Sequence, residues 1–107
     1  MVESTLQLNL VFNSLADPTR RDILQRVLKA ELSITEIAEK YTMTFAAVSK
    51  HLQKLERANL ILRRRQGKYY YVQASPETLK STEAYLKQYQ MMAVDRFDRL
   101  EDYLKER

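Results

Sequence analysis

The sequence predicts a mainly α-helical α+β fold, with five helices and one two-stranded β-hairpin. Only one Gly and two Pro occur among the 107 residues, a composition that favours helices over sheets. Apolar residues recur at helical spacing through most of the chain, behind recognisable helix-capping residues. The single glycine, Gly67, lies between two short segments of strand-forming residues. A chain of this length suits one domain, so residues 1–107 are predicted to fold as one unit.

Composition also narrows the classes of function. The chain contains no Cys and one His, which leaves no disulfide framework, zinc ribbon or thiol chemistry. No apolar run approaches the roughly 20 residues of a membrane span, and the N-terminus shows no secretory leader. No glycine-rich loop is present to cradle a phosphate. We therefore expect a cytoplasmic protein that is not an enzyme and uses no cofactor.

Two helices are expected to begin the fold. Residues 4–15 place Leu8, Phe12 and other apolar residues at helical spacing with almost no charge, which hints at a partner surface. Asp17-Pro18 starts the second helix, because Asp accepts from free amides and Pro suits the first helical position. The expected buried face of this second helix consists of Ile23, Leu24, Val27 and Leu28.

Two arginines stand near the start of the second helix, where the helix dipole disfavours positive charge. Arg20 is expected to form a salt bridge, to Asp17 or Glu36. Arg21 suits either a salt bridge or a contact with phosphate, and the sequence does not choose between them.

A helix-turn-helix follows. Ser33-Ile34-Thr35-Glu36 is a capping box that opens a third helix, and the small Ala38 allows another helix to cross close by. Thr42-Met43-Thr44 forms the turn, and Thr44 caps a fourth helix over 45–58.

The two faces of the fourth helix differ in character. At 100° per residue, Val48, Leu52 and Leu55 point inward. The opposite face carries Ala46, Lys50, Gln53 and Arg57, with Ser49 and Lys54 at its margins. Small residues at its start let the backbone approach base edges, and Lys50, Ser49 and Gln53 suit base recognition. An ordinary exposed helix face is the alternative, and position in the motif favours DNA.

A basic hairpin comes next, formed by strands 61–66 and 68–74 around Gly67, which sits where positive φ is needed. Three arginines precede the tip and three tyrosines follow it. The set of Tyr70, Val72 and Ala74 is favoured for the buried side over Tyr69 and Tyr71. Such a wing can follow phosphates or enter the minor groove, whereas its tyrosines suit cross-strand packing.

Positive charge is concentrated on these elements. Residues 44–73 hold seven basic residues against one acid, Glu56, for a net charge of +6, while 1–43 and 74–107 carry −1 each. A basic surface on one motif attracts the phosphates of DNA, because binding releases condensed counterions.

The last helix is predicted over 76–105, opened by Ser75-Pro76-Glu77. A helix of about 30 residues spans about 45 Å, more than so small a domain covers, so its far end must project. Its apolar stripe then calls for a second chain, and segments 1–16 and 76–105 are predicted to form a homodimer. The predicted dimer contacts are Leu8, Phe12, Tyr89, Ala93, Phe97, Leu100 and Leu104.

With these elements in place, the chain resembles the ArsR family of winged-helix repressors. The resemblance rests on residues 12–21 (FNSLADPTRR), Ile23-Leu24, 45–52 (FAAVSKHL), 55–58 (LERA) and the segment 60–71. It implies a symmetric dimer that binds a pseudo-palindromic operator, represses transcription and sits on the nucleoid. The family's base-reading positions fall on Phe45, Ala46, Ser49 and Lys50, where Phe45 either packs locally or touches a thymine methyl. The full predicted set of DNA contacts is Thr44, Phe45, Ala46, Ser49, Lys50, Gln53, Arg63, Arg65 and Lys68.

Metal-sensing members of that family use Cys pairs, or His and carboxylates on the last helix. This chain has no Cys, and His51 alone cannot supply the several N or S ligands of a transition-metal site. We therefore expect no metal site, and a packing role for His51. A small-molecule or protein effector, or none, stays open. Alternative functions are a winged-helix protein-interaction module, which the polar outward face opposes, and a nonspecific DNA-architectural protein.

Overall fold

The computed structural model describes residues 2–106, with side chains from Thr5 onward. Met1, the first residue of the predicted dimerisation segment 1–16, and Arg107 lie outside the described residues. The helices are α1 (Val2–Leu15), α2 (Pro18–Lys29), α3 (Ile34–Ala38), α4 (Phe45–Arg57) and α5 (Pro76–Lys105). The strands are β1 (Leu32–Ser33), β2 (Ile61–Gln66) and β3 (Tyr69–Ala74). This arrangement confirms the predicted winged helix-turn-helix fold.

The helix starts follow their capping residues, with one exception. Asp17 accepts from the Arg20 amide at 3.1 Å, Ser33 and Glu36 complete the capping box, and Thr44 Oγ1 accepts from the Ala47 amide at 3.1 Å. Ser75 occupies the cap position of α5, where the helix was predicted to open, but its side chain makes no capping hydrogen bond. Its hydroxyl turns instead toward Thr78 Oγ1, 3.5 Å away.

A residue in the left-handed conformation follows the end of α4. Asn59 has φ 59°, and the Leu60 amide donates back to Leu55 O at 3.0 Å, the six-to-one bond of a Schellman motif. The side chain of Asn59 then bonds Gln7 on α1, and its carbonyl accepts from Thr78 on α5. The end of α4 is therefore tied to both terminal helices.

The sheet contains one strand more than the sequence predicts. Its order is β1-β3-β2, with β2 and β3 forming the predicted antiparallel hairpin, and Gly67 at its tip has φ +63°. The extra strand β1 pairs through Leu32 and Ser33 alone, too short to show alternation. Val72 is fully buried and Ala74 half-buried, so the favoured strand parity is correct, but Tyr70 lies near the tip and is 46% exposed.

The core gathers buried side chains from α1 to α4, from the segment after α4 and from β2 and β3, and the half-buried Leu32 of β1 and Leu79 of α5 pack against it. The fully or largely buried apolar residues are Val11, Ile23, Leu24, Val27, Ile37, Val48, Leu52, Leu55, Ala58, Leu60, Ile61 and Val72. The predicted inward face of α4 is confirmed. Leu28, which was expected on the buried face of α2, is 52% exposed, whereas its neighbour Val27 is buried in the core.

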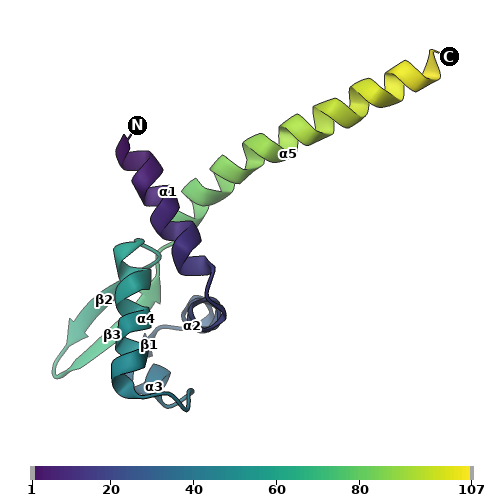
Figure 1. Ribbon diagram of the computed structural model, residues 1–107. Helices are drawn as coiled ribbons and strands as arrows, with labels where there is room; N and C mark the ends of the chain where they lie inside the picture. Colours follow the sequence, from purple (N-terminus) through teal and green to yellow (C-terminus); the bar gives the residue numbers. More distant parts are fainter. Residues whose placement is uncertain (1, 107) are drawn as a thin grey trace.

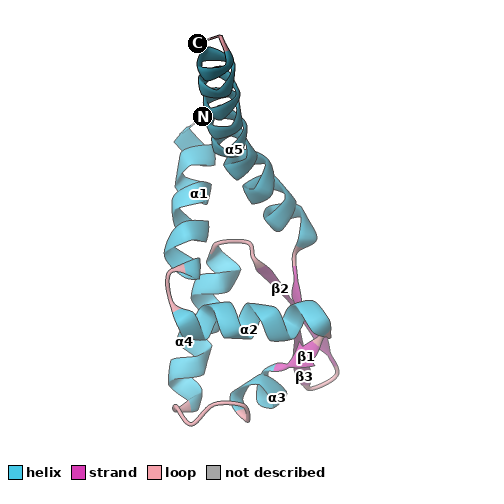
Figure 2. Cartoon of the chain, turned by 90° about the vertical axis from the view of Figure 1, so that its right-hand side faces the viewer, coloured by secondary structure: helices cyan, strands magenta, loops and turns pink. Residues whose placement is uncertain are grey.

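The terminal helices project from this body. Figure 1 shows α5 leading away from the sheet as a rod, and Figure 2 shows α1 and α5 rising on the same side. The overall extents are 69 × 31 × 21 Å. Within α5 the buried residue is Thr82, while its far half lies in the open. None of the helices in the described part of the chain is long and apolar enough to cross a membrane.

Candidate nucleic-acid interface

The outward face of α4 points to solvent and does not pack against the rest of the described chain. Ala46, Lys50 and Gln53 are exposed, and Ser49 is half-buried at the margin. Because Val48, Leu52 and Leu55 are fully buried on the other side, the helix is fixed on the core with this polar row turned away. Within residues 2–106, no hydrogen bond or ion pair engages the side chains of Lys50 and Gln53. They are available to a partner outside the chain.

The start of α4 is shaped for close approach. Thr44 caps the helix and is exposed, and Ala46 and Ala47 leave little side-chain bulk in the first turn. Phe45 is 58% exposed, so local packing covers less than half of it. A thymine methyl is one apolar group that such a ring can contact.

The hairpin presents its two faces differently. Cross-strand register places Arg63 opposite Val72 and Arg65 opposite Tyr70, on the side where Ile61 is buried. Arg64 lies opposite Tyr71 on the other side. Each basic side chain near the tip lies over a ring: Arg65 over Tyr70 and Lys68 over Tyr69, both with 5.8 Å to the centroid. The rings of Tyr69 and Tyr70 therefore stabilise the charged groups of Lys68 and Arg65 through cation–π contacts.

Two of the wing arginines are held by carboxylates. Arg64 Nη2 donates to Glu31 Oε1 at 2.6 Å, and its Nε donates to Oε2 at 3.2 Å. These bonds from the Arg64 guanidinium hold the pKa of the Glu31 carboxyl below its usual range. Arg63 Nε lies 3.2 Å from Glu56 Oε1, an ion-pair contact outside hydrogen-bond geometry. Glu56 is the single acid of the basic segment, and both pairings escaped the sequence analysis.

Arg65 and Lys68 differ from these two. In the portion of the chain that the structure covers, no carboxylate forms an ion pair with either, and both side chains are exposed. Arg65 Nε donates to Gly67 O at 3.1 Å, which steadies the tip of the hairpin. Of the three predicted wing contacts, Arg65 and Lys68 are thus open to an anion, whereas Arg63 reaches one only by sharing or leaving Glu56.

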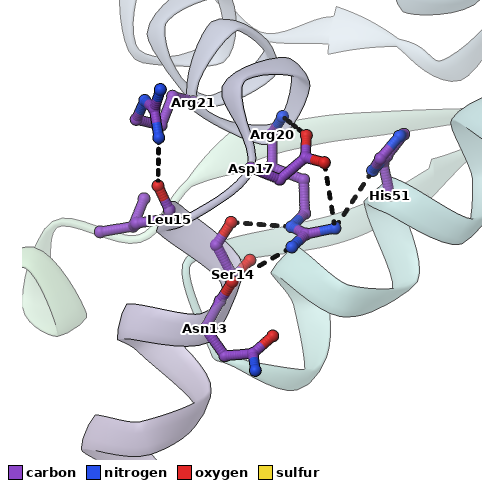
Figure 3. A network of polar contacts seen from close by, with 7 residues as sticks. All are labelled: Asn13, Ser14, Leu15, Asp17, Arg20, Arg21 and His51. Carbon is purple, nitrogen blue, oxygen red and sulfur yellow. Dashed lines mark hydrogen bonds and ion pairs between the residues drawn. The ribbon is translucent and has the colours of Figure 1, made fainter.

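Behind α4 lies a network centred on Arg20 (Figure 3). This residue is 7% exposed, and its Nη1 is 4.0 Å from Asp17 Oδ2, which agrees with the predicted salt bridge. Burial alone would raise the pKa of the Asp17 carboxyl, but the Arg20 amide hydrogen bond and guanidinium charge outweigh it and lower that pKa. Arg21, whose role was open, donates to Leu15 O at 2.8 Å. His51 of α4 contacts Arg20, so its role exceeds simple packing.

A second polar cluster joins α2 to the loop after α3. The Tyr41 hydroxyl donates to Asp22 Oδ2 at 2.5 Å, and Arg26 donates to the same oxygen at 2.9 Å. Burial and this hydrogen bond raise the pKa of Tyr41 to about 12, and the Tyr41 and Arg26 bonds lower the pKa of Asp22. The cluster therefore connects α2 to the segment between the two helices of the helix-turn-helix.

The predicted dimer contacts lie together on the projecting side of the molecule. On α1, Leu8 is half-buried and Phe12 is 39% exposed, with the Phe12 ring 6.4 Å from that of Tyr85 on α5. Farther along α5 the predicted contacts are all exposed, and Phe97 is the most exposed of them at 71%. The remaining members of this exposed set are Tyr89, Ala93, Leu100 and Leu104.

A helix-turn-helix backed by a core, with a polar outward helix face and a basic hairpin beside it, defines a winged-helix DNA-binding protein. The pattern described as "Bacterial regulatory protein, arsR family" matches residues 17–62. The transcriptional repressor SdpR of Bacillus subtilis (strain 168) is 31% identical over 75 residues, which cover 70% of this chain and 83% of SdpR. The chain therefore belongs to the ArsR family of DNA-binding transcriptional regulators, and it is not an enzyme.

Solved structures agree on the fold. An ArsR-like transcriptional regulator from Rhodococcus sp. RHA1 superposes with a TM-score of 0.80 at 24% identity, covering 94% of both chains. A homodimeric winged helix-turn-helix DNA-binding domain from Mycobacterium bovis gives a TM-score of 0.68 at 22% identity, covering 83% of each chain. At these identities the likeness concerns the fold alone.

Proposed function

We propose that the protein is a homodimeric repressor that binds an inverted-repeat operator and does not sense a transition metal. The observation that carries this proposal is the outward row of α4, where Lys50 and Gln53 are exposed without partners inside the described chain. In the major groove, Lys suits guanine acceptors and Gln suits adenine. Thr44, Phe45, Ala46 and Ser49 complete the base-reading surface.

The wing supplies the phosphate contacts in this proposal. Arg65 and Lys68 stand at its tip on the supporting tyrosines, while Arg63 can join them by sharing Glu56. Phosphate contacts fix the register of the protein on the duplex, and base contacts give the sequence preference. A protein-interaction module would need an apolar outward face on α4, which this helix lacks.

The exposed stripe on α5 supports the dimer. Phe97, Leu100 and Leu104 are each more than half exposed in the single chain, and so large an apolar surface calls for cover. The similar domain from Mycobacterium bovis is described as homodimeric. We therefore assign residues 1–16 and 76–105 to the dimer interface of a single winged-helix domain.

The absence of metal sensing rests on the chemistry of the chain. It has no Cys and a single His, and His51 is engaged by Arg20. Among the side chains that the structure describes, those of residues 5–106, no three of His, Asp or Glu gather closely enough to hold a metal ion. What releases the repressor from DNA, a small molecule, a partner protein or dilution of the protein itself, is a separate property.

The test is selection from random duplexes with purified, metal-free protein, followed by sequencing. We expect an inverted repeat whose half-sites are centred about 34 Å apart, one turn of B-DNA, or a multiple of it. Repeating the selection with added zinc should return the same sequence and affinity. Enrichment without any preferred sequence would overturn the proposal in favour of a nonspecific DNA-binding protein.

A further inference from the structure

Arg20 is a buried cation that joins the end of α1 to α2. Its Nε donates to Ser14 O at 2.7 Å, and its Nη2 donates to Asn13 O at 3.1 Å. These are carbonyls of the last turn of α1, which lack the usual i+4 helical amide; Asn13 O also accepts from the Ala16 amide at 3.3 Å. Arg20 belongs to the first turn of α2, so one side chain fixes the angle between the two helices.

The remaining nitrogen of this guanidinium contacts α4, the recognition helix of the proposed function. Arg20 Nη1 lies 3.3 Å from His51 Nδ1 on α4, as Figure 3 shows. A guanidinium has donors and no acceptor, so in this contact the imidazole must accept through Nδ1 and carry its proton on Nε2. The hydrogen bond therefore requires the neutral ring. It links α1 to α4 through a single residue of α2.

We propose that Arg20 and His51 are positioning residues for the recognition helix, and that protonation of His51 weakens operator binding by breaking their hydrogen bond. This inference rests on the proposed function, in which α4 reads the operator and α1 belongs to the dimer interface. His51 directly follows Ser49 and Lys50 in α4, so a shift of its ring is carried to the base-reading row. The two recognition helices of a dimer keep their spacing only if each is held firmly relative to α1.

The charges around the ring set the sign of the effect. Arg20 and the N-cap carboxylate of Asp17 interact with it from α2 and the residue before it, whereas the carbonyls at the end of α1 bond Arg20 and not the ring. Protonation at Nδ1 replaces an acceptor by a donor and sets a second cation against Arg20. Asp17 attracts both cations, but its Oδ2 lies 4.0 Å from Arg20 Nη1, beyond hydrogen-bond range, so it does not replace the acceptor that the guanidinium loses.

The effect of protonating His51 on operator binding can be distinguished from a general effect of added positive charge. His51 is the only histidine, so a change that depends on protonating an imidazole can come from no other residue. An added positive charge on a DNA-binding protein would by itself strengthen attraction to phosphate. Positioning through Arg20 predicts the opposite, a loss of specific binding as the pH falls. The direction of the change therefore distinguishes the two effects.

The experiment measures affinity at constant ionic strength from about pH 8 to about pH 5.5, for the duplex recovered by selection and for a scrambled duplex. For the parent we expect specific affinity to fall about tenfold, the scale of one hydrogen bond to a charged group, while scrambled binding holds or rises. His51→Gln keeps a side-chain acceptor without a titrating group, so its profile should be flat. Arg20→Lys should bind more weakly at pH 8 and lose most of the pH dependence.

Amide NMR spectra of the free parent protein test the same contact without DNA and without any variant. As the His51 ring titrates, the amides of residues 49–53 should move with it. A ring that titrates while those amides stay fixed would overturn the inference, as would a His51→Gln profile as steep as that of the parent. Failure of the proposed function appears separately, as a parent protein that selects no sequence even at pH 8.

Discussion

Lys50 stands in the middle of the outward row of α4, and Lys54 follows one turn later at its margin. If Lys50 reads a base, Lys50→Ala should lower discrimination between the selected and scrambled duplexes by about 1–3 kcal/mol, the value of a good bidentate base contact. Lys54→Ala removes the same charge and should weaken both complexes alike. Competition binding assays at one salt concentration give both differences, and equal effects of the two variants would remove Lys50 from the base-reading set.

Glu31 limits the positive charge that the wing offers to DNA, because it holds the Arg64 guanidinium through two hydrogen bonds. Glu31→Gln should release Arg64 toward phosphate, raise affinity for scrambled DNA and steepen its salt dependence by about one phosphate contact per protomer. Glu39→Gln changes net charge equally at an exposed residue that takes no part in this ion pair. The slope of binding constant against salt should separate them, and identical slopes would show that Glu31 acts only through net charge.

Much of this residue-level geometry lies beyond sequence reasoning. The inward face of α4 follows from local periodicity, and the hairpin tip follows from one glycine, so both were predicted correctly. Arg20 and His51 are 31 residues apart, and Arg64 and Glu31 are 33 apart. Their meeting depends on how separate elements pack, which no local spacing encodes. The two-residue strand β1 and the exposed Leu28 escaped prediction for the same reason.

At the scale of elements, the bond between Tyr41 and Asp22 ties α2 to the helix-turn-helix. Tyr41→Phe should lower the free energy of unfolding by about 1 kcal/mol near neutral pH. The lowered pKa of Asp22 means that its stabilisation is present above the carboxyl's ordinary range and is lost as the pH falls. Urea titrations should therefore show parent and variant converging in acid. A difference that persists at about pH 2, well below the ordinary carboxyl pKa, would point to packing instead.

The end of α4 offers a second comparison between elements. Asn59 adopts φ 59° and also bonds Gln7 through its side chain. Asn59→Gly keeps the backbone conformation and loses only that bond, whereas Asn59→Ala also places a methyl group in the left-handed region, at a further cost of about 1–2 kcal/mol. Thermal unfolding should rank the parent above Gly and Gly above Ala. Equal stability of the two variants would mean that the turn has rearranged.

At the scale of the whole molecule, the rod of α5 must be covered by a second chain if the proposal is right. Leu100→Glu places charge on the exposed stripe and should yield monomers, seen by sedimentation, with specific DNA binding lost. Gln88→Glu is the matched control, because at 100° per residue it points away from that stripe. Should Leu100→Glu sediment as the parent does, α5 is not the interface.

If α5 forms the dimer interface, the stability of the folded protein depends on its concentration. In a dimer closed over α5, the partner is a ligand for the folded chain, so mass action makes the melting temperature rise with protein concentration. Operator occupancy then depends on the square of the monomer concentration wherever monomers predominate. If the proposed dimer and operator are right, a cell that dilutes the protein by growth would empty the operator sharply, with no inducer required.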